Sequence, residues 1–194
     1  TQSRSSAASD VYKRQLPVQS GSDRILKLMR RRYSSASYLE LISRIRENRP
    51  GISFSSDFIV GFPGETDKDF QDTLDIVEKV GFDESFSFIY SPRPNTPAAG
   101  MEDNVSKDIK KERLTILQHK LNELSSKISR KMVGSLERCL VLGVSKKNPG
   151  ELQARTENNR VVNFATDANV VGKFVNLKIV DQLTNSLRGK LERF

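Results

Sequence analysis

The stretch from Ser55 to Thr66, SSDFIVGFPGET, combines residue types that form ligand cradles in α/β proteins. An apolar run at 58–60 leads directly into a turn with Gly61 and Gly64, and Thr66 has the side chain expected at a helix N-terminus. At the carboxyl end of a parallel strand, such a turn offers backbone amides to a ligand, because glycine permits close approach. The stretch therefore predicts a small-molecule site.

Two further segments bring polar groups to the same predicted edge. In LPVQSGS at 16–22, Gln19 and Ser20 follow a short apolar run, and in FSFIYSPRP at 86–94 a proline-rich loop carries Arg93. Because the carboxyl ends of parallel strands meet at one edge of a sheet, we expect the three segments to share one site.

The elements around these segments alternate between strand and helix patterns. Apolar periodicity and capping residues predict strands at 16–20, 52–60 and 86–90, with helices beginning near Ser22, Ser34 and Thr66. Strands joined by helices of this length imply right-handed crossovers and a parallel sheet. A longer helix is predicted from Ser106 to Gly134, as a bridge to a second domain.

After Gly134 the pattern becomes β-rich. Short runs separated by turns occupy 138–144, 151–156, 160–165, 174–180 and 186–193. Five short strands in about 60 residues predict a small all-β, OB-like barrel.

Charge favours a polyanionic partner for this barrel. The 194-residue chain carries a net charge of +8, which suits nucleic acid. Basic and amide side chains near the predicted turns form a candidate RNA-binding set: Lys146, Lys147, Arg155, Asn158, Asn159, Arg160 and Arg188. The alternative is an ordinary solvated barrel surface. Aromatic residues are sparse there (Phe164, Phe174, Phe194), so base stacking has little support from the sequence.

The composition argues against several kinds of site. A single cysteine, Cys139, and a single histidine, His119, exclude a disulfide within the chain and a thiolate-bound metal or iron–sulfur site on this chain alone. Cys139 is interpreted as a small apolar core residue, and His119 as a solvated one. No apolar run approaches the ~20 residues that span a bilayer, so we expect no membrane partner and a cytoplasmic location. Residues 1–15 lack apolar periodicity, and we expect them to be non-native or disordered.

Several motifs, in order, resemble the radical-SAM methylthiotransferases. They are LPVQSGS at 16–22, MRRRY at 29–33 and SDFIVGFPGE at 56–65. The segment FDESFSFIYSPRP at 82–94 is similar to one subgroup, the tRNA-2-methylthio-isopentenyladenosine synthases, and RTENNRVVNF at 155–164 with NSLRG at 185–189 is similar to the TRAM domain of that subgroup. One departure is Asn95, where the family has glycine; asparagine tolerates φ > 0 better than most residues.

The resemblance implies a fold in two parts. Residues 16–105 would be the C-terminal portion of a radical-SAM partial (β/α) barrel, 106–133 a bridging helix, and 134–194 a TRAM RNA-binding domain. The intact enzyme would use S-adenosyl-L-methionine (SAM) and two 4Fe–4S clusters to add a methylthio group at carbon 2 of isopentenyladenosine beside the anticodon. Its partners would be the tRNA anticodon stem-loop and an electron donor, and it would be a monomer. The family's cluster-binding cysteines are absent, so we expect no catalytic residues in this chain and no activity from it alone.

The resemblance also assigns SAM-binding roles. Gln19 and Ser20 would contact the ribose or amino-acid group, Ile59 and Gly61 would border the adenine, and Arg93 would face the substrate or the SAM carboxylate. Asp57 would orient neighbouring groups. Alternatives remain open: Asp57 as a carboxylate that caps a turn, and Arg93 as a surface arginine. For the whole chain, the alternative functions are a non-catalytic RNA-binding fragment, or a methylthiotransferase that acts on a ribosomal protein or on threonylcarbamoyl-adenosine.

Overall fold

A computed structural model describes residues 13–94, 96–146 and 148–192, with side chains from residue 15. The chain forms two compact units, one from Arg14 to Ser125 and one from Ser126 onward. The boundary lies inside the longest helix, α4 (Lys107–Met132), so that each unit contains part of it. The domain bounds 16–105, 106–133 and 134–194 expected from the sequence stay predictions.

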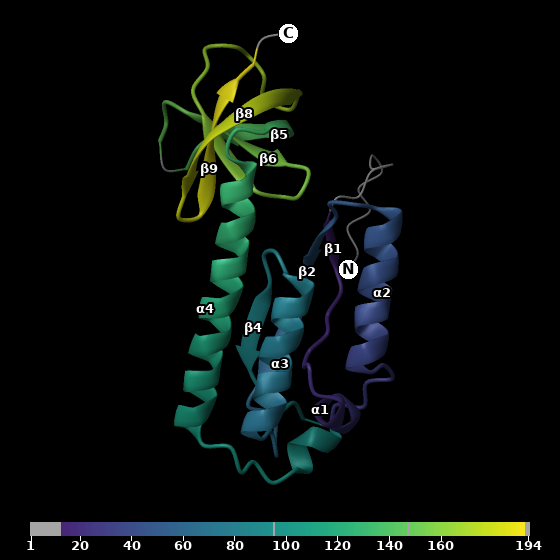
Figure 1. Cartoon of the computed structure of the whole chain (residues 1–194). Coiled ribbons are helices and arrows are strands. Elements are labelled where there is room, and N and C mark those ends of the chain that lie inside the picture. The colour runs from purple at the N-terminus through teal and green to yellow at the C-terminus, as the bar shows by residue number, and fades with distance from the viewer. Residues whose placement is uncertain (1–12, 95, 147, 193–194) are drawn as a thin grey trace. The chain divides into compact units, whose positions relative to one another are not determined.

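The first unit alternates strands and helices (Figure 1). In chain order its elements are β1 (Lys13–Gln15), α1 (Asp23–Leu28), α2 (Ser35–Asn48), β2 (Ser53–Ser55), β3 (Asp57–Val60), α3 (Asp67–Val80), β4 (Phe86–Ile89), a 3₁₀ helix η1 (Pro97–Gly100) and the first part of α4. β3 and β4 pair in parallel, with Asp57 opposite Phe86 and Ile59 opposite Phe88. The expected parallel strand–helix alternation is therefore confirmed.

The core of this unit lies between the strands and the helices. Phe58 and Val60 alternate with partly exposed residues along β3, and Phe54 is buried in β2, so one face of the strands is buried. Val77 from α3 and Leu117 from α4 pack against that face. The other face carries Phe86 and Phe88, which are 60% and 54% exposed.

The helix ends follow the capping chemistry expected from the sequence. The Thr66 and Asp69 side chains form a capping box at the start of α3, and Gly81 ends that helix in the left-handed conformation. Ser22 and Ser34 cap α1 and α2. Short polar side chains therefore determine where these helices begin.

The strands depart from the sequence expectation in two places. Residues 13–15, expected outside the fold, form β1 and pair with β2. Residues 16–20 run alongside β2 and β3 without forming a named strand. The single strand expected at 52–60 is interrupted at Ser56, whose Oγ accepts from Val18 N and donates to Leu16 O, each at 2.9 Å. A hydroxyl that replaces ladder hydrogen bonds explains why 16–20 is not a regular strand and why the strand expected at 52–60 is interrupted.

The second unit is a closed five-stranded barrel. Its strands are β5 (Leu136–Val144), β6 (Leu152–Thr156), β7 (Val161–Phe164), β8 (Phe174–Leu183) and β9 (Ser186–Leu191), in the order β5-β6-β7-β9-β8. β7 and β9 are parallel neighbours, whereas the other pairs are antiparallel. Inward residues such as Cys139, Ala154, Phe164 and Leu177 fill the interior. The OB-like barrel predicted from the sequence is confirmed.

Candidate functional site

A cavity of about 540 Å³ lies at the carboxyl ends of β3 and β4. It brings together three of the six side chains assigned to a cofactor from the sequence, namely Gln19, Ile59 and Arg93. These residues come from separate segments, so their convergence reflects the parallel topology. The volume falls within the roughly 300–1,000 Å³ of small-molecule sites.

The wall of this cavity combines aromatic and cationic groups. Phe62, Phe88 and Tyr90 supply aromatic surface, and Arg30 and Arg31 join Arg93 among the lining residues. Phe62 and Tyr90 meet edge to face, with ring centroids 4.9 Å apart. An apolar wall with cations suits a ligand that carries both a flat ring and an anionic group.

Tyr90, another lining residue, carries a buried polar atom. Its hydroxyl oxygen is buried and has no hydrogen-bond partner among the described residues. A buried hydroxyl left in this way is costly unless water or a ligand satisfies it. The sequence motifs assign Tyr90 no role in the site, although Tyr90 follows the apolar run of β4 directly.

Gln19, which lines the cavity, has an unusual backbone conformation. Its φ is +69°, and the N–H of Ser20 donates to the carbonyl of Val18 at 2.9 Å, which makes Gln19 the centre of a γ-turn. Gln19 also donates its N–H to Asp57 O and accepts from Ile59 N, each at 2.9 Å. β3 therefore holds this strained residue in place through both its N–H and its carbonyl group.

The other three assigned residues lie outside the cavity lining. Ser20 is fully buried, with its Oγ 3.3 Å from Thr73 Oγ1, and accepts from Ser22 N. Asp57 accepts from Gln15 Nε2 at 3.0 Å and 3.2 Å. These contacts are structural, and a role for either side chain in binding SAM stays a prediction.

Gly61 sits at the turn after β3 in a conformation that favours glycine. Its φ is +68°, and a Cβ there would lie 2.3 Å from Lys110 Cγ. Its N–H donates to Glu65 Oε2 at 2.7 Å. Lys110 is itself buried and donates to Asp103 at 2.5 Å, so it has little room to move.

Glu65 links this turn to α4. Arg113 donates to Glu65 Oε2 at 2.8 Å and to Asp67 Oδ1 at 2.7 Å. Burial raises the pKa of Glu65, although the Gly61 N–H and the Arg113 charge act in the opposite direction. Glu65 and Arg113 thus fix the turn beside the cavity, and only Glu65 lies within a motif that the sequence marks.

Asp69 ties the starts of α1 and α3 together. Its carboxylate accepts from Ser22 Oγ at 2.6 Å and from Thr66 N and Oγ1 at 2.8 Å and 2.6 Å, and it pairs with Arg24. Burial alone would raise the pKa of Asp69, but the hydrogen bonds from Arg24, Ser22 and Thr66 outweigh it and hold that pKa well below its usual range. This network positions the loop that begins at Gln19.

The described residues offer no place for a metal cluster. They contain no group of three or more histidine, cysteine or carboxylate side chains arranged to hold a metal ion. Cys139 is fully buried in the barrel core, and burial raises the pKa of its thiol to about 12. Since metal ligation needs the thiolate, the donor set does not fit a 4Fe–4S cluster. Across the same residues, no helix is long and apolar enough to cross a membrane.

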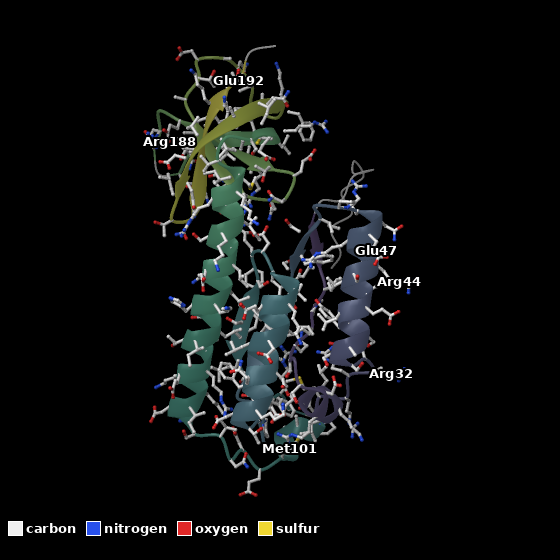
Figure 2. All side chains as sticks on the ribbon, in the orientation of Figure 1. Arg32, Arg44, Glu47, Met101, Arg188 and Glu192 are labelled. Atoms are coloured by element: carbon white, nitrogen blue, oxygen red, sulfur yellow. The ribbon has the colours of Figure 1, made fainter. Side chains whose placement is uncertain are left out.

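The candidate RNA-binding residues occupy different environments on the barrel, and one of them, Arg188, is labelled in Figure 2. Lys146 is exposed, and Arg188 is half exposed with its guanidinium 3.3 Å from Glu151. Arg155 donates to the carbonyl and the side chain of Asn159 at 2.7 Å and 2.9 Å. Lys147 lies outside the described residues.

Two of the set are less accessible than the sequence suggests. Arg160 is 6% exposed and donates to Ser129 Oγ at 2.5 Å. Asn158 lies 2.5 Å from Thr156 Oγ1 and is only partly exposed. Both therefore have structural contacts, and their part in RNA binding stays a prediction.

The two units correspond to two known domain families. Residues 15–77 match the Radical SAM superfamily, and residues 130–191 match the TRAM domain. The chain thus combines part of a radical-SAM domain with a TRAM barrel, as the motifs indicate.

Curated proteins with similar sequences indicate a more specific family. Over 90% of its length the chain is 61% identical to the tRNA-2-methylthio-N(6)-dimethylallyladenosine synthase of Hahella chejuensis, and over 91% it is 56% identical to that of Chromohalobacter salexigens. The same enzyme of Pseudomonas syringae is 57% identical over 91% of the chain. The chain spans about 40% of the length of each relative. The resemblance to the methylthiotransferase family is confirmed, and the chain matches a fragment of these proteins.

Proposed function

We propose that this chain is the SAM-binding and RNA-binding part of a tRNA methylthiotransferase that modifies carbon 2 of isopentenyladenosine beside the anticodon. The observation that carries the proposal is the convergence of Gln19, Ile59 and Arg93 on one cavity in a chain 61% identical to a tRNA-2-methylthio-N(6)-dimethylallyladenosine synthase. The relatives' names support the reaction, and the cavity supports a cofactor site in this chain.

The volume of the cavity and the groups on its wall support SAM as its ligand, and SAM when bound would supply the methyl group and the source of the radical. Ile59 and Phe88 offer an apolar wall to the adenine, and Arg93 offers a cation to a carboxylate. Gln19, held by β3, borders the same space. The role of these side chains is to orient the cofactor and to exclude water, because the cofactor carries the reactive chemistry.

The iron–sulfur chemistry does not fit the residues of this chain. The ligands of both clusters would belong to the part of the relatives' length that the chain does not match. We accordingly propose that the chain alone binds ligands but does not methylthiolate tRNA. An electron donor, a monomeric state and a cytoplasmic location belong to the same proposal.

The test is nucleoside analysis of tRNA. A bacterial strain that lacks its own enzyme would be complemented with the complete gene that encodes this chain, and its tRNA would be digested and examined by mass spectrometry. We expect 2-methylthio-isopentenyladenosine to return with the complete gene and isopentenyladenosine alone to remain with the 194-residue chain. Accumulation of a different modified nucleoside, or none from the complete gene, would reject the proposed reaction.

A non-activity readout tests the cavity separately. Titration of the chain with S-adenosylhomocysteine, followed by NMR, should shift signals from Ile59 and its neighbours. Arg93→Ala should weaken the response, whereas the exposed Arg44→Ala on α2 is the matched control.

A further inference from the structure

An aromatic ring on the outside of the barrel has no role in the site described above. Phe174 begins β8 and is 55% exposed, whereas Phe164 is 1% exposed in the barrel core. The Cζ atom of Arg138 lies 4.3 Å from the centroid of the Phe174 ring. An exposed ring with a guanidinium on it forms a flat, polarisable surface at the protein–water boundary.

Strand register shows which groups share this face. Phe174 pairs with Leu140 of β5, which in turn pairs with Arg155 of β6. Directly opposite residues in a sheet project from the same face, and the inward neighbours Cys139 and Val175 are buried. Phe174 and Arg155 therefore lie on one outer face, about 10 Å apart at two strand spacings.

The same register places further cations on the other side of the ring. Asn176 pairs with Arg138, and Lys178 pairs with both Leu136 and Lys190. Lys178 and Lys190 are exposed. We call the outer surface formed by Arg155, Leu140, Phe174, Arg138, Lys178 and Lys190 the Phe174 face.

The charge of this face is predominantly positive. Its cations are Arg138, Arg155, Lys178 and Lys190. The carboxylates in the same rows are Glu157, whose Oε1 lies 3.8 Å from Arg138, and Glu192, next to the end of β9. A ring flanked by cations on both sides complements a ligand that has a flat base and negative charges spaced along a chain.

We propose that the Phe174 face binds single-stranded RNA, with an unpaired base stacked on the Phe174–Arg138 pair and the flanking phosphates beside Arg155 on one side and Lys178 and Lys190 on the other. The proposal rests on the proposed function for RNA as the partner, and adds a stacking site that the candidate set lacks. Stacking needs an unpaired base, because the bases of a duplex present only their edges. The Phe174 face thus selects looped over paired RNA.

The experiment compares two RNA probes on the intact chain. Binding of a labelled oligoadenylate of about 12 nucleotides and of an RNA duplex of about 12 base pairs, each long enough to span a single-strand site of this kind, would be measured by fluorescence anisotropy at several salt concentrations. The variants are Phe174→Ala, Phe174→Tyr, which keeps a ring, and Val180→Ala. Val180 is 46% exposed on the same strand, roughly 20 Å along it from Phe174, so it controls for loss of exposed apolar surface.

We expect Phe174→Ala to weaken single-strand binding by about 5- to 150-fold, the range for loss of one base–aromatic stack. Duplex affinity and the dependence of log K on log salt should not change, since no charge is removed. Phe174→Tyr and Val180→Ala should bind like the original chain. Circular dichroism spectra and melting curves would establish that each variant is folded.

The experiment distinguishes failure of the stacking site from failure of the proposed RNA-binding function. Equal single-strand affinity for Phe174→Ala and the original chain would overturn the stacking site and leave RNA binding intact. Equal losses for single-strand and duplex probes would also overturn it, because the ring would then act without an unpaired base. No binding of either probe by the original chain would overturn both proposals.

Discussion

Asp69 offers a sharp test of how the first unit is held together. Asp69→Asn keeps the size of the side chain but replaces one carboxylate oxygen with an NH₂ group, which then faces the donors of Thr66 or Arg24. The buried bonds from Ser22 and Thr66 are charge-assisted, each worth about 1.5–3 kcal/mol, although such terms are not additive. Arg24 is half exposed, so its ion pair adds little. We expect a loss of about 3 kcal/mol in the free energy of unfolding of this unit.

The effect of Asp69→Asn on the free energy of unfolding should also depend on pH, in a direction that follows from the pKa of Asp69. The folded-state pKa of Asp69 is depressed, so its stabilisation is complete above the unfolded value of about 3.9 and fades as the pH falls below it. Asp69→Asn lacks this term, so its difference from the original chain should stay constant from about pH 7 to about pH 5 and should be smaller at about pH 3.

The assay is urea unfolding followed by circular dichroism, with hydrogen exchange of the α3 amides to assign the change to this unit. Asp72→Asn is the matched control, because Asp72 forms an exposed pair with Lys68, worth at most about 0.5 kcal/mol. A difference between the original chain and Asp69→Asn that is the same at about pH 3 as at about pH 7, or a loss no greater than that of the control, would refute the reasoning.

Three further outcomes are expected. In urea unfolding, Gly61→Ala should destabilise the chain more than Gly51→Ala. Both glycines have positive φ, so alanine adds about 1–2 kcal/mol of backbone strain at each, but only at Gly61 would the new Cβ also clash with Lys110. Equal losses for the two variants would contradict the close approach of Lys110. The thiol of Cys139 should not react with a disulfide reagent at about pH 8 until urea is added, because it is buried and its pKa is about 12; fast labelling of the folded chain would contradict this. Arg188→Ala should reduce the salt dependence of RNA binding by about one phosphate contact, and an unchanged slope would show that Arg188 stays with Glu151.

The sequence was most informative where local chemistry decides the structure. Serine and threonine caps, the glycine after α3 and the alternation of strands could be predicted, because each depends on residues close in the chain. The cavity could be predicted in part: Gln19, Ile59 and Arg93 lie near or beyond the carboxyl ends of successive extended segments, and parallel topology then brings them together.

The remainder depends on contacts between distant residues. Arg113 reaches Glu65 from a helix that begins about forty residues further on, and no local pattern marks that pairing. Likewise, Arg160 could not be distinguished from a surface arginine without the contact that it makes with Ser129. Phe174 is an aromatic residue that lies on the surface instead of in the core. Its exposure and its contact with Arg138 follow only from the barrel register.

The strand order of the barrel has a consequence for synthesis on the ribosome. β9 lies between β7 and β8, although it follows both in the sequence. Until β9 has been made, β7 and β8 each lack a neighbour, and the barrel interior around Val162 and Leu177 stays open to water. The nascent barrel is thus exposed to proteases and aggregation until its final strand is released, and loss of only this strand should leave an open sheet rather than a smaller barrel.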